Sequence, residues 1–170
     1  MKLIATAEIE IQRSREIVFN TLVACTTYPR ILHAKWPVPG IALAELPEGD
    51  ELAAGVRRLV TLTDGTVIDE EILEFERPRV HRYAWSKGLR CPFSLMVRRA
   101  KSPRHFYEVG DGAKVEWTYA FEVTNVLCYP AVKPLSMRFG SWMRAGLMRA
   151  KSALESATGD QLGPGDDRPD

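Results

Sequence analysis

DGTVIDEEILEFERPRVHRYAW, residues 64–85, alternates between apolar and polar residues in the way that half-buried strands do. The pair Asp64-Gly65 is a strong signal for a hairpin turn, and the pair Arg77-Pro78 closes the strand that follows it. The stretch therefore predicts two antiparallel strands, over residues 66–76 and 79–86, with a third strand preceding the turn.

One face of the first of these strands mixes carboxylates with large apolar side chains: Val67, Asp69, Glu71, Leu73 and Phe75. Residues two apart on a strand share a face, and the apolar members of this set indicate that the face is buried. The side chains of Asp69 and Glu71 are therefore expected to point inward. The opposite assignment stays open, because Ile68 and Ile72 on the other face compete for burial.

The segments on either side of this stretch predict an α+β fold. A strictly alternating strand over residues 4–12 is followed by two short helices near residues 14–24 and 30–36. About six antiparallel strands come next, of which KVEWTYAFEVT at residues 114–124 is the clearest. Apolar residues at helical spacing from 135 to 154, with Pro134 in the first turn, predict a long last helix. A curved antiparallel sheet of about seven strands must cover one face, and this helix is the element that can cover it.

The chain has 170 residues, which is long enough for one well-packed domain. We assign residues 1–157 to that domain and predict that 158–170, rich in Gly, Pro and Asp, form a disordered tail. The N-terminal segment lacks the apolar region of a signal peptide, and no run approaches the roughly 18 apolar residues that span a bilayer. A cytoplasmic protein without stable membrane insertion is expected.

Charge and cysteine content argue against several classes of function. The net charge of +1 gives no overall field to recruit nucleic acid, so no nucleic-acid partner is expected. The three cysteines, Cys25, Cys91 and Cys128, are widely spaced and form no metal-binding motif, so neither a metal nor a cofactor is predicted. The sequence also lacks a nucleophile elbow, a phosphate-binding loop and a nucleotide fingerprint, which argues against hydrolase, kinase and dehydrogenase functions.

Three phrases of the sequence resemble the SRPBCC superfamily, the helix-grip fold of START domains, birch-pollen-allergen-like proteins and polyketide cyclases. They are SREIVFNTL after the first strand, GVRRLVTLTDGTVIDEEILEFERPRVHRYAW, and GDGAKVEWTYAFEV before a final helix that ends LMRAKSALES. The resemblance covers roughly residues 3–156. It implies a deep cavity between the sheet and the long helix, with no cofactor and with a few polar groups in an apolar wall.

With that cavity, strand parity and helical spacing select the candidate site residues. Arg58 shares its face with Val60 and Leu62 and is expected inside, where it needs a carboxylate partner such as Asp69 or Glu71 across the hairpin. Candidates for ligand binding are Arg58, Asp69, Glu71, Leu73, His81, Tyr83, Trp85, Trp117, Tyr119, Phe139, Trp142 and Met143.

Three functions fit these residues. The preferred one is binding or transport of a hydrophobic small molecule (a lipid, isoprenoid, aromatic or polyketide) by a monomer or homodimer, because it needs only the cavity and a few polar anchors. The second is an aromatase/cyclase-like enzyme, with Asp69 or Glu71 as the base and Arg58, His81 or Tyr83 as the donor to an enolate oxygen. The third is a protein-interaction domain similar to chaperone activators, in which the cavity has no role.

Overall fold

A computed structural model describes residues 2–47, 51–88 and 93–156 of the chain. The tail over 158–170 and Cys91 lie outside the described residues. Strands and helices follow one another in the order β1 (Lys2–Ile11), α1 (Arg15–Val23), η1 (Cys25–Thr27), α2 (Tyr28–Ile31), β2 (Ile41–Glu45), β3 (Arg57–Leu62), β4 (Val67–Glu76), β5 (Val80–Lys87), α3 (Phe93–Met96), β6 (Val97–Val109), β7 (Gly112–Val123), η2 (Val126–Cys128) and α4 (Tyr129–Ser156).

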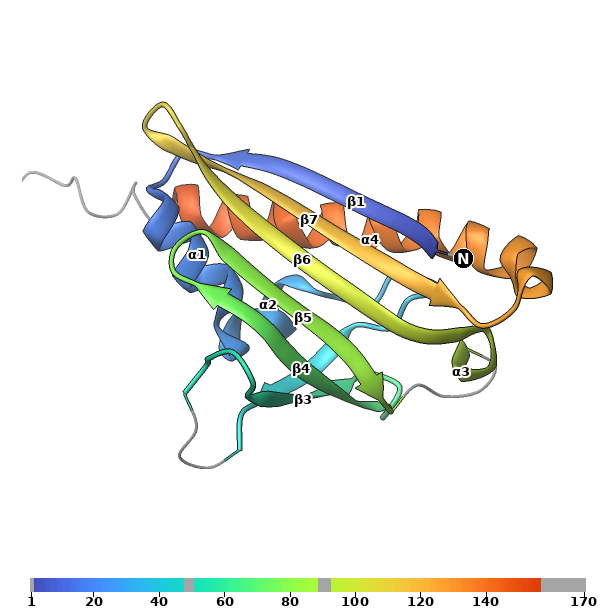
Figure 1. Ribbon diagram of the computed structural model, residues 1–170. Helices are drawn as coiled ribbons and strands as arrows, with labels where there is room; N and C mark the ends of the chain where they lie inside the picture. The colour runs from blue at the N-terminus through green and yellow to red at the C-terminus, as the bar shows by residue number, and fades with distance from the viewer. Residues whose placement is uncertain (1, 48–50, 89–92, 157–170) are drawn as a thin grey trace, which may run out of the picture.

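The strands form one seven-stranded antiparallel sheet in the order β1-β7-β6-β5-β4-β3-β2. Strand β1 pairs along its whole length with β7, from Lys2 opposite Glu122 to Ile11 opposite Ala113. The sheet curves around α4, which runs along one of its faces behind β1 and β7 (Figure 1). The predicted α+β helix-grip fold, with its curved sheet, long last helix and short helices after the first strand, is confirmed.

The core lies between the concave face of the sheet and one side of α4. In β7 the alternation of the sequence appears directly as alternation of burial, with Val115, Trp117, Tyr119 and Phe121 inside. Helix α4 contributes a stripe of buried residues at helical spacing to this core: Val132, Ser136, Phe139, Trp142, Met143, Gly146, Leu147 and Ala150. No helix among the described residues combines the length and the hydropathy needed to cross a membrane.

Helix α4 begins earlier than the sequence predicts. It starts at Tyr129, so Pro130 rather than Pro134 occupies the first turn, and Pro134 lies inside the helix. A proline inside a helix cannot donate the hydrogen bond to the preceding turn, and its ring also crowds the carbonyl four residues earlier. The five additional residues extend the helix beyond the predicted start.

The face assignment of β4 is wrong in the sequence prediction. Ile68, Glu70 and Ile72 are buried at 3%, 2% and 0% exposure, whereas Asp69 and Glu71 lie on the outer face. A bulge between Ile72 and Glu74 then changes the parity. Phe75 was one of the residues from which the buried face was inferred, and it does pack inside against Phe19. Asp69 and Glu71 precede the bulge, so they lie on the opposite side of the strand from Phe75 and face outward.

Candidate functional site

A cavity of about 370 Å³ lies between the sheet and α4. Its wall is built from β2, β3, β4, β5, β7, the three helices α2, α3 and α4, and the loop before β2. Most of the lining is apolar or aromatic: Tyr28, Leu32, Pro37, Val38, Pro39, Ile41, Val60, Leu62, Ile68, Trp85, Phe93, Met96, Tyr119, Leu135, Phe139 and Trp142. Such a wall suits an apolar molecule of small size.

The polar side chains of the lining lie at two places. Asp64 and Thr66 belong to the turn between β3 and β4, where the Asp64 carboxylate accepts a hydrogen bond from the backbone N–H of Thr66. Glu70 lies deep in the wall, 2% exposed. Glu70 is therefore the buried carboxylate of the described cavity wall, at the position next to the two carboxylates selected from the sequence.

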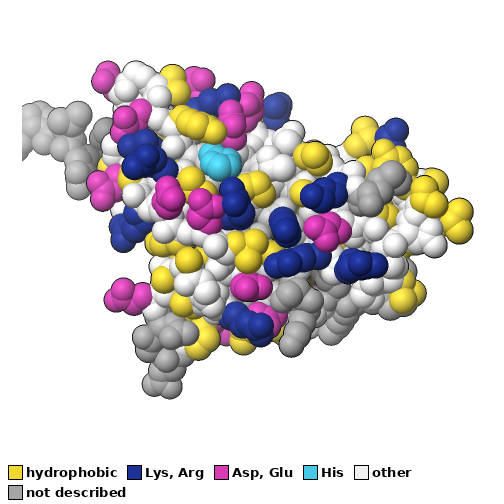
Figure 2. Space-filling view, in the orientation of Figure 1, with side chains coloured by type: hydrophobic (Ala, Val, Ile, Leu, Met, Phe, Trp, Pro, Cys, Tyr) yellow, Lys and Arg dark blue, Asp and Glu magenta, His cyan; other side chains and the backbone are white. Residues whose placement is uncertain are grey.

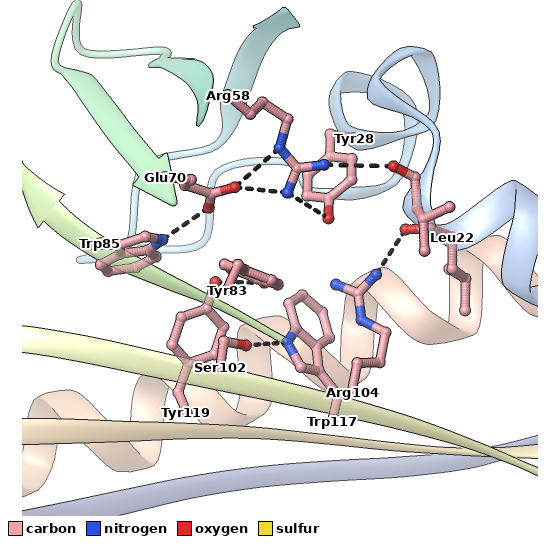
Figure 3. Close-up of polar contacts among 11 residues, drawn as sticks. Leu22, Tyr28, Arg58, Glu70, Tyr83, Trp85, Ser102, Arg104, Trp117 and Tyr119 are labelled. Carbon is pink, nitrogen blue, oxygen red and sulfur yellow. Dashed lines mark hydrogen bonds and ion pairs between the residues drawn. The ribbon is translucent and has the colours of Figure 1, made fainter. Parts of the chain in front are cut away.

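Arg58 holds the Glu70 carboxylate in place. Nε and Nη2 of Arg58 both donate to Oε2 of Glu70, at 3.0 Å and 2.6 Å, and Nε1 of Trp85 donates to Oε1 at 2.8 Å (Figure 3). Arg58 is completely buried and also donates to the hydroxyl of Tyr28 at 2.9 Å. A buried ion pair is tolerated only when such additional hydrogen bonds satisfy both partners.

A second buried arginine, Arg104 of β6, lies close by without a carboxylate partner among the described residues. Its Nη1 donates to the carbonyl of Leu22 at 2.6 Å, and its guanidinium lies 4.2 Å from the ring centre of Trp117. Arg58 likewise reaches the carbonyl of Val23 at 3.4 Å. Leu22 and Val23 end α1, so both arginines stabilise the negative end of that helix (Figure 3).

Two tyrosines continue the polar cluster across the sheet. The hydroxyls of Tyr83 and Tyr119 lie 2.7 Å apart, and either can donate. Burial raises the pKa of both phenols, so both keep their proton at neutral pH. Tyr119 lines the cavity, whereas Tyr83 lies behind it.

His81 of β5 is fully buried between the rings of Phe75 and Tyr83. Neither of its ring nitrogens has a hydrogen-bond partner in the part of the chain that the structure describes. Burial, and then the charges of Arg58 and Arg104, hold the pKa of His81 well below its usual value. The ring is therefore neutral at pH 7 and is poorly suited to act as a proton donor.

The structure separates the sequence-selected residues into three groups. Those on the cavity wall are Trp85, Tyr119, Phe139 and Trp142. Those buried behind the wall are Arg58, His81, Tyr83, Trp117 and Met143. Those on or near the outer face are Asp69, Glu71 and the half-buried Leu73.

Asp69 and Glu71 are engaged on the outer face, and the expectation that they point into the cavity is wrong. Asp69 pairs with Arg57 at 3.1 Å, and Glu71 pairs with Arg99 at 3.7 Å. Figure 2 shows one face of the molecule, on which basic and acidic side chains interleave. The buried cluster contains four polar residues that the sequence analysis missed: Tyr28, Glu70, Ser102 and Arg104. Glu70 could have been found from the sequence, because it shares its face with Ile68 and Ile72; no sequence signal marks the other three.

The structure contains no metal-binding cluster within the described ranges: no group of three or more His, Cys, Asp or Glu side chains is placed to hold an ion. The polar cluster of the wall is built for hydrogen bonding instead. It offers one carboxylate acceptor and phenolic hydroxyls at the inner end of an apolar cavity.

Comparison with known proteins agrees with this geometry. The model of the family described as "Polyketide cyclase / dehydrase and lipid transport" matches residues 2–155. Among curated proteins none matches the chain in sequence.

Solved structures share the fold at low sequence identity. Norcoclaurine synthase of Thalictrum flavum, a point mutant with a transition-state analogue, is 14% identical at a TM-score of 0.70 over 93% of this chain and 97% of that one. XoxI of Bacillus cereus is 23% identical at a TM-score of 0.66 over 91% and 97% of the two chains. Ara h 8.0201 is 15% identical at a TM-score of 0.65 over 92% and 99%. Because the family model covers nearly the whole chain, the protein belongs to the polyketide cyclase/dehydrase and lipid-transport family of the SRPBCC superfamily.

Proposed function

We propose that this protein binds a hydrophobic small molecule in the cavity between its sheet and α4. The observation that carries the proposal is the cavity itself, about 370 Å³ with a wall that is mostly apolar and aromatic. Sites for small molecules have this makeup, with a few polar groups that fix the orientation of the ligand. The family description, which includes lipid transport, supports the same reading.

The enzyme alternative loses the base that the sequence analysis gave it. Asp69 and Glu71 are paired with arginines on the outer face and do not line the cavity. Glu70 does line it, but its carboxylate accepts three hydrogen bonds from Arg58 and Trp85. Both oxygens of this carboxylate are therefore already engaged by protein donors. The geometry therefore favours binding over proton abstraction.

A titration with a neutral fluorescent probe, N-phenylnaphthylamine, tests the proposal. Its emission rises in an apolar site, so saturable enhancement is expected with the parent protein. Two neighbours on β3 supply a matched pair of variants: Val60 lines the cavity, and Leu59 is 46% exposed on the outer face. Val60→Phe fills part of the cavity and is expected to weaken probe binding about tenfold, a loss of about 1.4 kcal/mol.

Leu59→Phe adds a larger ring outside the cavity and is the control that should leave binding unchanged. Absence of saturable binding to the parent protein would contradict the proposal. Equal affinities of the two variants would also contradict it, because the probe would then sit somewhere other than the cavity.

A further inference from the structure

The charges on the cavity wall limit which ligands it can accept. Among the described lining residues are two acids, Asp64 and Glu70, and no lysine, arginine or histidine. A carboxylate ligand would therefore find no cationic side chain to contact and would meet Glu70 at the inner end. An unpaired charge in such surroundings is costly.

A cationic ligand is disfavoured for a different reason. Behind the wall, Arg58 and Arg104 are both fully buried, and Glu70 is the one carboxylate paired with them among the described residues. The neutral His81 adds no charge. An ammonium group would have to compete with Arg58 for Glu70, beside a cluster that already carries one positive charge in excess. A carboxylate gains little from that excess, because Glu70 lines the cavity and neither arginine does.

Glu70 retains capacity to accept one more hydrogen bond. Each carboxylate oxygen can accept two. Oε2 accepts both of its bonds from Arg58, whereas Oε1 accepts one, from Trp85. A donor on the ligand can therefore bind to Oε1 without displacing a protein group.

Tyr119 supplies a second polar group in the wall, a phenolic hydroxyl that can donate a hydrogen bond where Glu70 accepts one. Trp85 joins the two anchors, because its nitrogen donates to Glu70 and its ring centre lies 4.9 Å from that of Tyr119. Only one of the two phenolic protons of Tyr83 and Tyr119 is used in the bond between them. When Tyr83 is the donor, the proton of Tyr119 is free to point into the cavity.

We propose that the cavity selects neutral apolar molecules that carry a hydroxyl group, an alcohol or a phenol, with this hydroxyl donating to Glu70 and contacting Tyr119. Such a group satisfies Oε1 of Glu70, adds no charge to the arginine cluster, and can accept from the phenol of Tyr119. The inference rests on the proposed function and specifies the ligand class of the same site.

A matched set of naphthalenes tests it by displacement of N-phenylnaphthylamine. The set is naphthol, methoxynaphthalene, naphthoate and naphthylmethylammonium, which share one ring system and differ in the polar group. Naphthol is expected to bind about tenfold more tightly than methoxynaphthalene, since only naphthol can donate a hydrogen bond to the charged acceptor Glu70. Naphthoate and naphthylmethylammonium are expected to bind more weakly than naphthol.

One pair of single variants and one double variant locate the effect. Tyr119→Phe should reduce the preference for naphthol over methoxynaphthalene, whereas Tyr83→Phe removes the same tyrosine pair but leaves the cavity hydroxyl and should keep the preference. A double variant, Arg58→Met with Glu70→Leu, removes the acceptor together with its partner. Replacing a whole buried ion pair by apolar residues often preserves folding, so this variant should bind naphthol and methoxynaphthalene equally.

Tightest binding of naphthoate, or equal binding of naphthol and methoxynaphthalene to the parent protein, would overturn the assigned ligand class. Both outcomes leave the proposed function intact as long as the probe still binds. Failure of N-phenylnaphthylamine itself to bind would overturn the proposed function and this inference together.

Discussion

Glu70 differs from its two acidic neighbours in what surrounds its carboxylate. The sequence presents Asp69, Glu70 and Glu71 as three similar acids in a row. In the structure, Glu70 is 2% exposed and held by Arg58 and Trp85, whereas the flanking acids form ion pairs at the surface. The physical consequence of losing each carboxylate should differ accordingly.

Glu70→Gln is expected to lower the free energy of unfolding by about 3–5 kcal/mol, because it leaves the buried charge of Arg58 without its counterion. Glu71→Gln, one residue away, should change it by less than about 1 kcal/mol, since exposed ion pairs contribute little. Urea denaturation of both variants measures the difference. Equal losses would show that the buried pair does not stabilise the fold as the geometry indicates.

His81 gives the protein a specific dependence of stability on pH. Burial, and then Arg58 and Arg104, lower the pKa of His81 in the folded state, whereas in the unfolded chain the pKa is about 6.5. Below that pH the unfolded chain binds a proton that the folded protein does not. The free energy of unfolding should therefore fall as the pH drops, by about 1.4 kcal/mol per pH unit, until the folded pKa is reached.

The variant His81→Phe should lose this part of the slope while keeping the ring contacts with Phe75 and Tyr83. Relative to the parent, it should gain about 1 kcal/mol of stability between about pH 6.5 and pH 5.5. Urea denaturation at several pH values measures both curves. Parallel curves for the parent and the variant would show that His81 is not the source of the slope.

At the scale of the element, the hairpin of β3 and β4 explains why the site was misassigned from the sequence. Its loop holds three residues, because Leu62 receives a hydrogen bond from Gly65 and donates to Thr66, and Gly65 adopts a positive φ of 77°. This register places Arg58 opposite Glu70. A two-residue turn of Asp64 and Gly65 would have shifted the pairing by one and placed Glu71 there, which is one of the two partners that the sequence suggested.

Gly88, just after β5, lies where the backbone of the sheet leaves no room for a side chain. It has a φ of +94°, and a Cβ there would collide with the carbonyl oxygen of Val67. Gly55 has a similar φ of +88°, but open space surrounds it. Gly55→Ala should therefore cost only the backbone strain of about 1–2 kcal/mol.

Gly88→Ala must in addition push the backbone of β4 away, so its cost should exceed that of Gly55→Ala. Urea midpoints with unchanged slopes measure the two losses. A loss for Gly88→Ala no larger than that for Gly55→Ala would show that β4 yields at this point without cost.

At the scale of the whole molecule, local patterns of the sequence predicted the long last helix and most of the strands, whereas the cavity was implied only by the family resemblance. Alternation in β7 and helical spacing in α4 are local signals, and both appear unchanged in the pattern of burial. The cavity wall joins residues as distant in the chain as Tyr28 and Trp142. Whether their side chains meet or leave a space depends on the sheet curvature and on the distance of α4, which no local pattern encodes.

Because the cavity exists only when sheet and helix are assembled, a ligand inside it should stabilise the whole fold. The chain unfolded in water retains no such site, so binding shifts the unfolding equilibrium fully. At a free N-phenylnaphthylamine concentration of 100 times its Kd, the gain is about 2.7 kcal/mol. For a chain of this size that gain raises the Tm by about 5–10 °C.

Circular dichroism at rising probe concentrations measures the shift. Leu59→Phe should show the same rise as the parent, and Val60→Phe should show a smaller one at equal probe concentration. A Tm that rises equally in both variants would place the stabilising site outside the cavity between the sheet and α4.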